Sequence, residues 1–334
     1  MNSPFFNRDR RKLSILAGLA GLGGLLAWGG VGAQTPAWPS KSVRVVVALA
    51  PGGLADVLSR TIESPLSKAL GQQVLIDNRG GAGGNVGGVE VARNGGDGHT
   101  LLIAPSTLES VNPLIFARMP FDPQKDLVPV GLLANSHLFL LVRPTLPVNT
   151  LEEFLAYAKA HPGTLNYGSA GNGTTPHLAG ELLKQGAGIT ATHVAYRGAA
   201  PAIQDVLSGQ IDFAFGPATV LSHVKAGKLK LLAVASRQRS PSAPDVRTFV
   251  EAGVDGVFAD SLFGIYAPAQ TPAAVIVRMS REVNKILAQP DIKARFLDLG
   301  AEAVPRQPAE YKAIVQAETS LFAEIVKSRG ITVD

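Results

Sequence analysis

The chain has 334 residues and contains no cysteine, which excludes disulfides, thiolate catalysis and cysteine-based metal sites. Its 31 Lys and Arg residues and 26 Asp and Glu residues give a formal net charge of +5, with no basic stripe of the kind that binds nucleic acid. We therefore expect no nucleic-acid partner, and a chain of this length can bury a large core without disulfides.

The first 33 residues have the order of a secretory signal peptide. Basic residues cluster at 8–12, an uncharged apolar stretch follows at 13–28, and small residues precede a cut after Ala33. A membrane anchor is the alternative, but the apolar stretch is slightly short for a span of about 20 residues. We predict cleavage and export to the periplasm, which leaves 27 basic and 25 acidic residues. The pair Arg10-Arg11 leaves the Sec and Tat routes both open.

Beyond this segment, short β-branched stretches alternate with amphipathic ones. Pro65 should kink or shorten the first helix, and Thr150 with Glu153 forms a capping box. The alternation predicts α/β lobes with mostly parallel sheets. We expect strands at 43–49, 73–78, 101–104, 138–143, 211–215 and 229–235, another strand ending at Ser169, a glycine-rich turn at 80–88, and helices from about Leu54, Thr150 and Thr175 and over the last forty residues.

Three of the predicted turns follow strands and open helices, at 51–53, 105–107 and 171–175. Turns rich in Gly and hydroxyl residues leave backbone N–H groups unpaired at the positive end of a helix dipole. Glycine also lets the backbone approach a ligand closely and adopt positive φ. These turns favour an anionic ligand held by main-chain and hydroxyl groups. Ordinary turns of an α/β fold are the alternative.

The remaining motifs predict no enzyme, cofactor or metal site. Residues 81–87 spell G-x-G-x-x-x-G, which is not the dinucleotide-binding fingerprint. Ser169 lacks the first glycine of a nucleophile elbow, because Tyr167 stands there, although His193 and Asp212 follow in the chain. None of the six histidines has the spacing of a zinc site.

For three side chains the sequence allows two interpretations each. His177 is either a core-edge residue or one that faces a ligand cleft. Arg197 is either a surface residue or the bidentate partner of a carboxylate. Glu318 lies on the apolar stripe of the last helix, either at its exposed rim or as a buried, hydrogen-bonded acid.

Taken together, these segments resemble the Bug-type family, the solute-binding proteins of tripartite tricarboxylate transporters. The resemblance runs in order through nearly the whole chain after the signal and depends on the number of matching pieces. It rests on Pro51-Gly52-Gly53 with Asp56, Asn78-Arg79-Gly80-Gly81-Ala82-Gly83-Gly84, Asp97-Gly98-His99-Thr100-Leu101-Leu102, Asn112-Pro113-Leu114, Phe121-Asp122-Pro123 with Asp126, Tyr167-Gly168-Ser169, His177-Leu178-Ala179-Gly180-Glu181, His193-Val194-Ala195-Tyr196-Arg197-Gly198, Ala226-Gly227-Lys228-Leu229 and Ala267-Pro268.

The resemblance implies a two-lobed α/β fold of the type II periplasmic-binding-protein class, with two chain crossings at a hinge. Lobe one would comprise 35–137 plus 265–334, and lobe two 138–264. The family's ligands are typically carboxylates held between the lobes, with no cofactor and no catalytic residue. By position, the implied ligand-binding residues are Gly52, Gly53, Ser106, Thr107, Ser169, Gly173, Thr174, Thr175 and Tyr196.

The chain departs from the family pattern at three positions. Ala55 replaces a hydroxyl residue, Gly216 replaces an acid that often follows a Phe, and Leu262 replaces a Trp. We interpret the missing acid as favouring a plainer acid as ligand, without an amino or hydroxyl group. The ligand itself stays open.

The resemblance therefore predicts a monomeric periplasmic protein that captures a small di-, tri- or other carboxylate and delivers it to the large and small subunits of a membrane permease. One alternative is a sensory role, in which the closed form is presented to a membrane kinase. A second is an exported serine hydrolase using Ser169, which would need a base and an oxyanion hole close by.

Overall fold

The computed structural model describes residues 38–333, so the predicted signal at 1–33 lies outside the described residues. One compact unit begins at Lys41, and it contains two β-sheets with helices packed against both. No helix among the described residues is long and apolar enough to cross a membrane.

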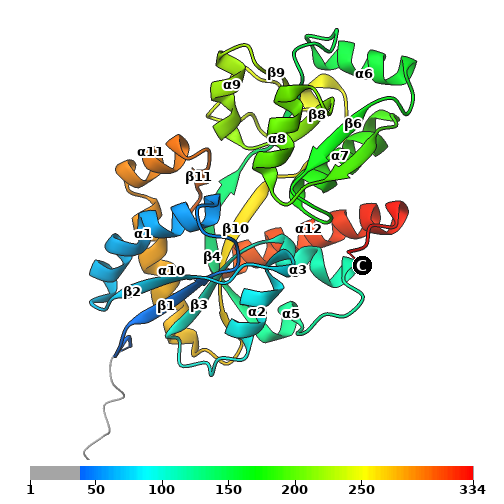
Figure 1. Cartoon of the computed structure of the whole chain (residues 1–334). Coiled ribbons are helices and arrows are strands. Elements are labelled where there is room, and N and C mark those ends of the chain that lie inside the picture. Colours follow the sequence, from blue (N-terminus) through cyan, green and yellow to red (C-terminus); the bar gives the residue numbers. More distant parts are fainter. Residues whose placement is uncertain (1–37, 334) are drawn as a thin grey trace, which may run out of the picture. The chain divides into compact units, whose positions relative to one another are not determined.

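The first sheet has six strands, with the three earliest in parallel order (Figure 1). Its strands are β1 (Val43–Val47), β2 (Val74–Asn78), β3 (Thr100–Pro105), β4 (Leu127–Ser136), β10 (Ser261–Pro268) and β11 (Glu302–Ala303). They lie in the order β11-β4-β10-β3-β1-β2. Strand β10 is antiparallel to both β3 and β4, and it therefore separates the parallel strands from β4.

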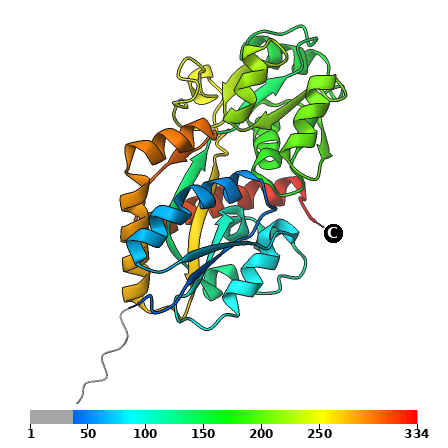
Figure 2. The ribbon, with the colours of Figure 1, turned by 60° about the vertical axis from the view of Figure 1, so that its left-hand side comes forward.

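Helices cover the two faces of the first sheet (Figure 2). Alternate side chains such as Val46 and Leu102 pack with Tyr311 in one buried cluster, whereas Val45 and Leu101 face the opposite side with Met279. Apolar side chains therefore point to both faces of β1 and β3, as expected for strands that are buried on both sides. The helices are α1 (Leu54–Leu70) and α10 (Ala273–Leu287) on one face, and α2 (Asn85–Ala92), α3 (Thr107–Ser110) and α12 (Pro308–Arg329) on the other. Shorter elements are η1 (Ala82–Gly84), α4 (Asn112–Ile115), α5 (Pro123–Asp126) and α11 (Pro290–Asp298).

The second sheet has five strands in the order β7-β6-β8-β5-β9. Its strands are β5 (Phe139–Val142), β6 (Asn166–Ser169), β7 (Thr192–Ala195), β8 (Phe213–Gly216) and β9 (Lys230–Val234). Strand β6 is parallel to β7 and β8, and β5 is antiparallel to β8 and β9. The accompanying helices are α6 (Leu151–Ala160), α7 (Thr175–Ala187), α8 (Ala199–Ser208), η2 (Ala218–Val220), α9 (Leu221–Lys225) and η3 (Val250–Ala252).

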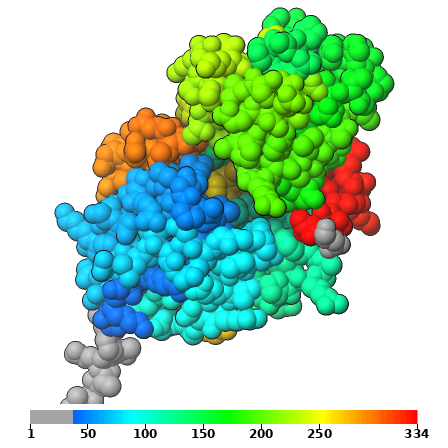
Figure 3. All heavy atoms as spheres, viewed as in Figure 1, coloured from blue at the N-terminus to red at the C-terminus, as the bar shows by residue number. Residues whose placement is uncertain are grey.

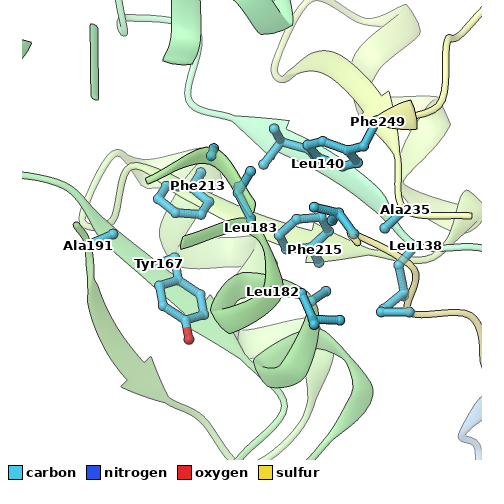
Figure 4. Close-up of a cluster of buried hydrophobic side chains, with 14 of the residues drawn as sticks. Leu138, Leu140, Tyr167, Leu182, Leu183, Ala191, Phe213, Phe215, Ala235 and Phe249 are labelled. Carbon is cyan, nitrogen blue, oxygen red and sulfur yellow. The ribbon is translucent and has the colours of Figure 1, made fainter. Parts of the chain in front are cut away.

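The core of the second sheet is rich in aromatic side chains. Tyr167 stacks on Phe213 with ring centroids 5.4 Å apart, and Phe215 lies 6.0 Å from Phe249. Figure 4 shows these rings with Leu182 and Leu183 of α7. A side chain at Gly180 would have its Cβ 2.2 Å from the Tyr167 ring, so only glycine lets α7 approach this closely. The close approach fixes α7 over β6.

The chain passes between the two sheets twice. The first crossing lies between β4 and β5, and the second lies between β9 and β10. Together with the two α/β sheets, these crossings confirm the predicted two-lobed fold. The lobe boundaries at 137/138 and 264/265 stay predictions.

The structure corrects several local predictions. Both sheets are mixed rather than mostly parallel, because β5 and β10 run against their neighbours. Helix α1 continues past Pro65 to Leu70, so the proline does not shorten it. The glycine-rich stretch at 80–88 is largely helical, since η1 and α2 occupy 82–92. The sequence also suggests Thr175, which precedes Pro176, as the N-cap of α7, but the helix has Thr174 in that position.

The predicted N-cap of α6 is confirmed, whereas the second hydrogen bond of the predicted capping box goes to Asn149 and not to the N-cap residue. The Thr150 hydroxyl accepts a hydrogen bond from the Glu153 N–H at 3.1 Å. The Glu153 carboxylate in turn accepts from the N–H of Asn149 at 2.6 Å, one residue before the N-cap.

Helix α12 packs in both cores, so truncating one of its buried side chains should lower the free energy of unfolding substantially. We expect Phe322→Ala to lower the free energy of unfolding by about 3–5 kcal/mol, since Phe322 is 1% exposed in the core of the second sheet. The control is Leu297→Ala, because Leu297 on α11 is 39% exposed. Urea unfolding followed by circular dichroism measures both. Equal losses in the two variants would contradict the packing argument.

Candidate functional site

The loops after β1 and β3 meet at one edge of the first sheet. In parallel strands the carboxyl ends share an edge, and Val47 of β1 pairs with Ile103 of β3 and Asn78 of β2. Residues 48–53 and 105–107 follow these ends, so the structure brings the first two predicted turns together.

The first loop is exposed and already hydrogen-bonded in part. Gly52 has φ of 77°, a conformation that favours glycine, and its N–H donates to the Asp56 carboxylate at 2.8 Å. Gly53 is the N-cap of α1, and its N–H donates to the Ala50 carbonyl at 3.3 Å. The first-turn N–H groups of α1 after Gly53 have no partner within the helix.

Ser106 and Thr107 are buried at the start of α3, with 2% and 7% exposure. The Ser106 N–H donates to the carbonyl of Leu262 on β10 at 2.9 Å. Burial raises the pKa of Glu318 to about 8, while a hydrogen bond from Ser106 acts in the opposite direction. Glu318 itself is half-buried, which lies between the two interpretations that the sequence left open, and it lies against a predicted ligand residue.

The second group of predicted residues lies at the carboxyl ends of β6 and β7. Ser169 pairs with Ala195, and the N–H of Tyr196 donates to the Ser169 carbonyl at 3.0 Å. The Tyr196 hydroxyl donates to the Asp205 carboxylate at 2.6 Å. Burial and this hydrogen bond raise the pKa of Tyr196 to about 12, so the phenol stays neutral.

The loop from Gly171 to Thr175 is held by its own polar groups. Thr174 donates its hydroxyl to the Gly171 carbonyl at 2.7 Å, and the Gly173 N–H donates to His177 Nδ1 at 3.1 Å. Thr175 is 7% exposed in the first turn of α7. These bonds fix the loop at the beginning of a 13-residue helix.

Gly173 also links the two groups of predicted residues. A Cβ on Gly173 would lie 2.1 Å from Cδ1 of Ile115, so the loop packs against the α3–α4 segment that begins at Thr107. Among residues 38–333, no hydrogen bond joins Gly52 or Gly53 to this second loop. Figure 3 shows a hollow between the blue segment after β1 and the green segment of the second sheet.

Ser169 has a histidine neighbour but not the environment of a nucleophile. Its hydroxyl lies 2.6 Å from His193 Nε2, and it also accepts the Gly171 N–H at 3.1 Å. Ser169 is only 1% exposed. His193 stacks on His177 at 3.9 Å, and among the described residues no carboxylate holds its Nδ1. The arrangement therefore lacks the orienting acid and the access that a hydrolase needs.

The three residues that depart from the family pattern all lie in closely packed, buried surroundings. Ala55 is fully buried in α1, and Leu262 belongs to the apolar cluster of the first sheet. A Cβ on Gly216 would lie 2.9 Å from Leu141 and 3.0 Å from Ile203. A carboxylate there would be buried among apolar side chains, which explains why glycine stands at this position. Arg197 is exposed and forms no ion pair among the described residues.

The polar cluster at the crossings was not found from the sequence. His137 Nδ1 lies 2.7 Å from Asp260, and its Nε2 lies 2.6 Å from Glu302. Ser236 donates to the same Asp260 carboxylate at 2.9 Å. The cluster joins the first crossing to the second and to β11. These residues are distant in the sequence, so no local pattern signals them.

This two-lobed α/β fold, with hydroxyl-rich loops at the carboxyl ends of parallel strands in both sheets, is the fold of a solute-binding protein. The family model of the tripartite tricarboxylate transporter family receptor matches residues 58–331. The chain belongs to this receptor family, which confirms the resemblance that the sequence motifs indicated.

Curated relatives match along most of their length. A UPF0065 protein from a Pseudomonas species is 35% identical over 292 residues, which are 87% of this chain and 87% of that protein. Protein BugT of Bordetella pertussis is 32% identical and covers 93% of this chain and 97% of its own.

Solved structures share the same fold. An R. palustris protein solved with adipate superposes with a TM-score of 0.80 at 32% identity and covers 88% of this chain and 99% of its own. MatC from Rhodopseudomonas palustris with bound malate has a TM-score of 0.75 at 33% identity and covers 86% and 100%.

The crossing cluster predicts a loss of stability at alkaline pH. Burial lowers the pKa of His137, but hydrogen bonds to Asp260 and Glu302 outweigh it and raise the pKa to about 9, against 6.5 when exposed. The stabilisation is complete below pH 6.5 and is lost as pH rises to 9, by on the order of 3 kcal/mol. Across this pH range, the free energy of unfolding measured with urea should fall more steeply in the wild type than in His137→Gln. Parallel curves would contradict the prediction.

The stacked pair predicts the opposite pH dependence on the acid side. Burial lowers the pKa of His177 and of His193 to about 4. The unfolded chain then binds more protons than the folded one between pH 6.5 and 4, so stability falls as pH falls, by on the order of 3 kcal/mol for His177. His177→Gln should weaken this dependence in urea unfolding. His161→Gln, at an exposed histidine, should leave it unchanged, and identical slopes in both variants would refute it.

Proposed function

We propose that this protein captures a small carboxylate between its two lobes and delivers it to a membrane permease. The observation that carries the proposal is the pair of hydroxyl-rich loops, one at the carboxyl edge of each sheet, of which the second packs on the segment that begins at Thr107. The similar proteins solved with adipate and with malate support a carboxylate as the ligand class.

The proposed contacts involve no cationic side chain. Helix α1 begins after the glycine loop 51–53 and α7 begins at the hydroxyl-rich loop 171–175. The N–H groups of a first helical turn are unpaired within the helix and attract anions. The buried hydroxyls of Ser106 and Ser169 add polar groups at the two edges. The proposed ligand residues are Gly52, Gly53, Ser106, Thr107, Ser169, Gly173, Thr174, Thr175 and Tyr196.

The remaining parts of the proposal follow from the family. The protein acts in the periplasm after removal of residues 1–33, binds without chemical conversion, and works as a monomer. Its partners are the large and small permease subunits. Closure moves the 138–264 lobe toward the lobe made of 35–137 and 265–334, because hinge motion around two crossings is a common closing movement.

A ligand screen tests the function directly. We expect adipate, malate or another small carboxylate to raise the thermal midpoint, because ligand that binds only the folded state stabilises it by mass action. Thermal unfolding with a library of mono-, di- and tricarboxylates measures this shift. Shifts with neutral sugars or cations and none with any acid would overturn the proposal.

The first loop provides a sharper test. Gly53 has φ of −73°, which other residues adopt, and a Cβ there would lie 3.3 Å from the Ala50 carbonyl oxygen. Gly53→Val should therefore fold but reduce carboxylate affinity by at least about tenfold, since its branched side chain covers the N–H groups that face the ligand. Calorimetric titration measures the affinity. Gly95→Val is the control because Gly95 has open space around it, and unchanged binding in Gly53→Val would exclude the loop as an anchor.

A further inference from the structure

A polar cavity lies between α7 and the end of α12, and Asn172 of the loop from Gly171 to Thr175 forms part of its wall. Its volume is about 560 Å³. His177, Glu181 and Lys184 line it from α7, at the i, i+4 and i+7 positions of one helix face, and Arg329 lines it from α12. None of the nine proposed carboxylate-binding residues lines this cavity.

The charges in this cavity do not balance. Glu181 is 4% exposed, and one of its oxygens accepts from both Lys184 Nζ and the Tyr167 hydroxyl at 2.7 Å. Its other oxygen lies 3.5 Å from Arg329 Nε. Two cations therefore share one carboxylate, and the described walls carry a net charge of +1.

One ring nitrogen at the cavity has no acceptor from the protein. His177 is 5% exposed, and its Nδ1 accepts the Gly173 N–H at 3.1 Å. Burial lowers the pKa of His177 to about 4, so the ring is neutral at pH 7 and carries its proton on Nε2. Among residues 38–333, no hydrogen-bond acceptor meets this Nε2–H. This N–H is therefore available to donate to an acceptor inside the cavity.

We propose that this cavity binds a compact oxyanion, either inorganic phosphate or a small carboxylate, at Lys184, Arg329 and His177 Nε2. An oxyanion supplies the missing negative charge and accepts from ammonium, guanidinium and imidazole N–H donors together. The two cations disfavour a metal ion, and the rings of His177 and His193 are stacked with an interplanar angle of 13°, so their nitrogens do not converge on one point.

The position of the cavity gives the anion a role in the second loop. Lys184 belongs to a helix of the second sheet, whereas Arg329 ends the helix that also packs in the first core. An anion between them joins these helices. It also fixes His177, whose other ring nitrogen holds the Gly173 N–H. The bound anion therefore stabilises the loop that the proposed carboxylate site uses.

Calorimetric titration of protein purified from expression of the full chain tests the site. Inorganic phosphate and acetate are titrated separately at constant ionic strength. We expect saturable binding of at least one of them, weakened by about tenfold in Arg329→Gln and in Lys184→Gln because each variant removes one charge-assisted contact. Arg239→Gln is the matched control, since Arg239 pairs with one carboxylate, Glu251, at an exposed position. Its affinity should equal that of the wild type.

Each result has a defined meaning. Binding of phosphate alone, weakened in both variants, supports the site and identifies phosphate. Binding of acetate alone, weakened likewise, supports the site and identifies a carboxylate. No saturable binding of either anion, or equal affinity in the wild type and in Arg329→Gln, overturns the proposal. Circular dichroism confirms that each variant is folded, and Gly53→Val should still bind the anion, which separates this site from the proposed carboxylate site.

Discussion

Helix α12 contributes side chains to the cores of both sheets, and the arrangement of the rest of the chain depends on this shared packing. Tyr311 and Val315 near its start lie in the cluster of the first sheet, and Phe322 and Ile325 lie in that of the second. Because one rigid helix serves both cores, it limits where α7 and the loop before it can lie. The packing of Gly173 on Ile115 follows from the same restriction.

Burial determines the charge state of the polar groups near the crossings. Burial raises the pKa of Glu318 to about 8 and of Glu109 to about 7, and it lowers the pKa of His177 to about 4. His137 is the exception, because two carboxylates outweigh its burial. At pH 7 Glu318 and His177 are therefore mostly neutral, and the charged His137 is paired with two carboxylates. This pattern keeps the number of buried charges small, as the cost of burying an unpaired charge requires.

The proposed carboxylate site and the cavity between α7 and α12 use different chemistry. The nine residues of the first carry no formal charge, so selectivity there comes from backbone N–H groups and hydroxyls that rigid strands hold in place. The cavity relies on Lys184 and Arg329, which share Glu181. His177 belongs to both regions, since one ring nitrogen holds the Gly173 N–H and the other faces the cavity. A single imidazole thus connects two polar sites without direct contact between their ligands.

The sequence by itself determined β1, β2, β3, β5, β6, β8 and β9, the N-cap of α6, the turns that follow β1, β3 and β6, and the receptor family, because each depends on neighbouring residues or on motifs in order. The sequence analysis did not identify β4 or β10. It also did not determine the direction of β5, since a buried apolar strand has the same composition in either orientation. Only the tertiary structure placed His137 between Asp260 and Glu302, and Lys184 near Arg329. Those contacts join residues more than 100 positions apart, and the packing of the helices and sheets decides which of them meet.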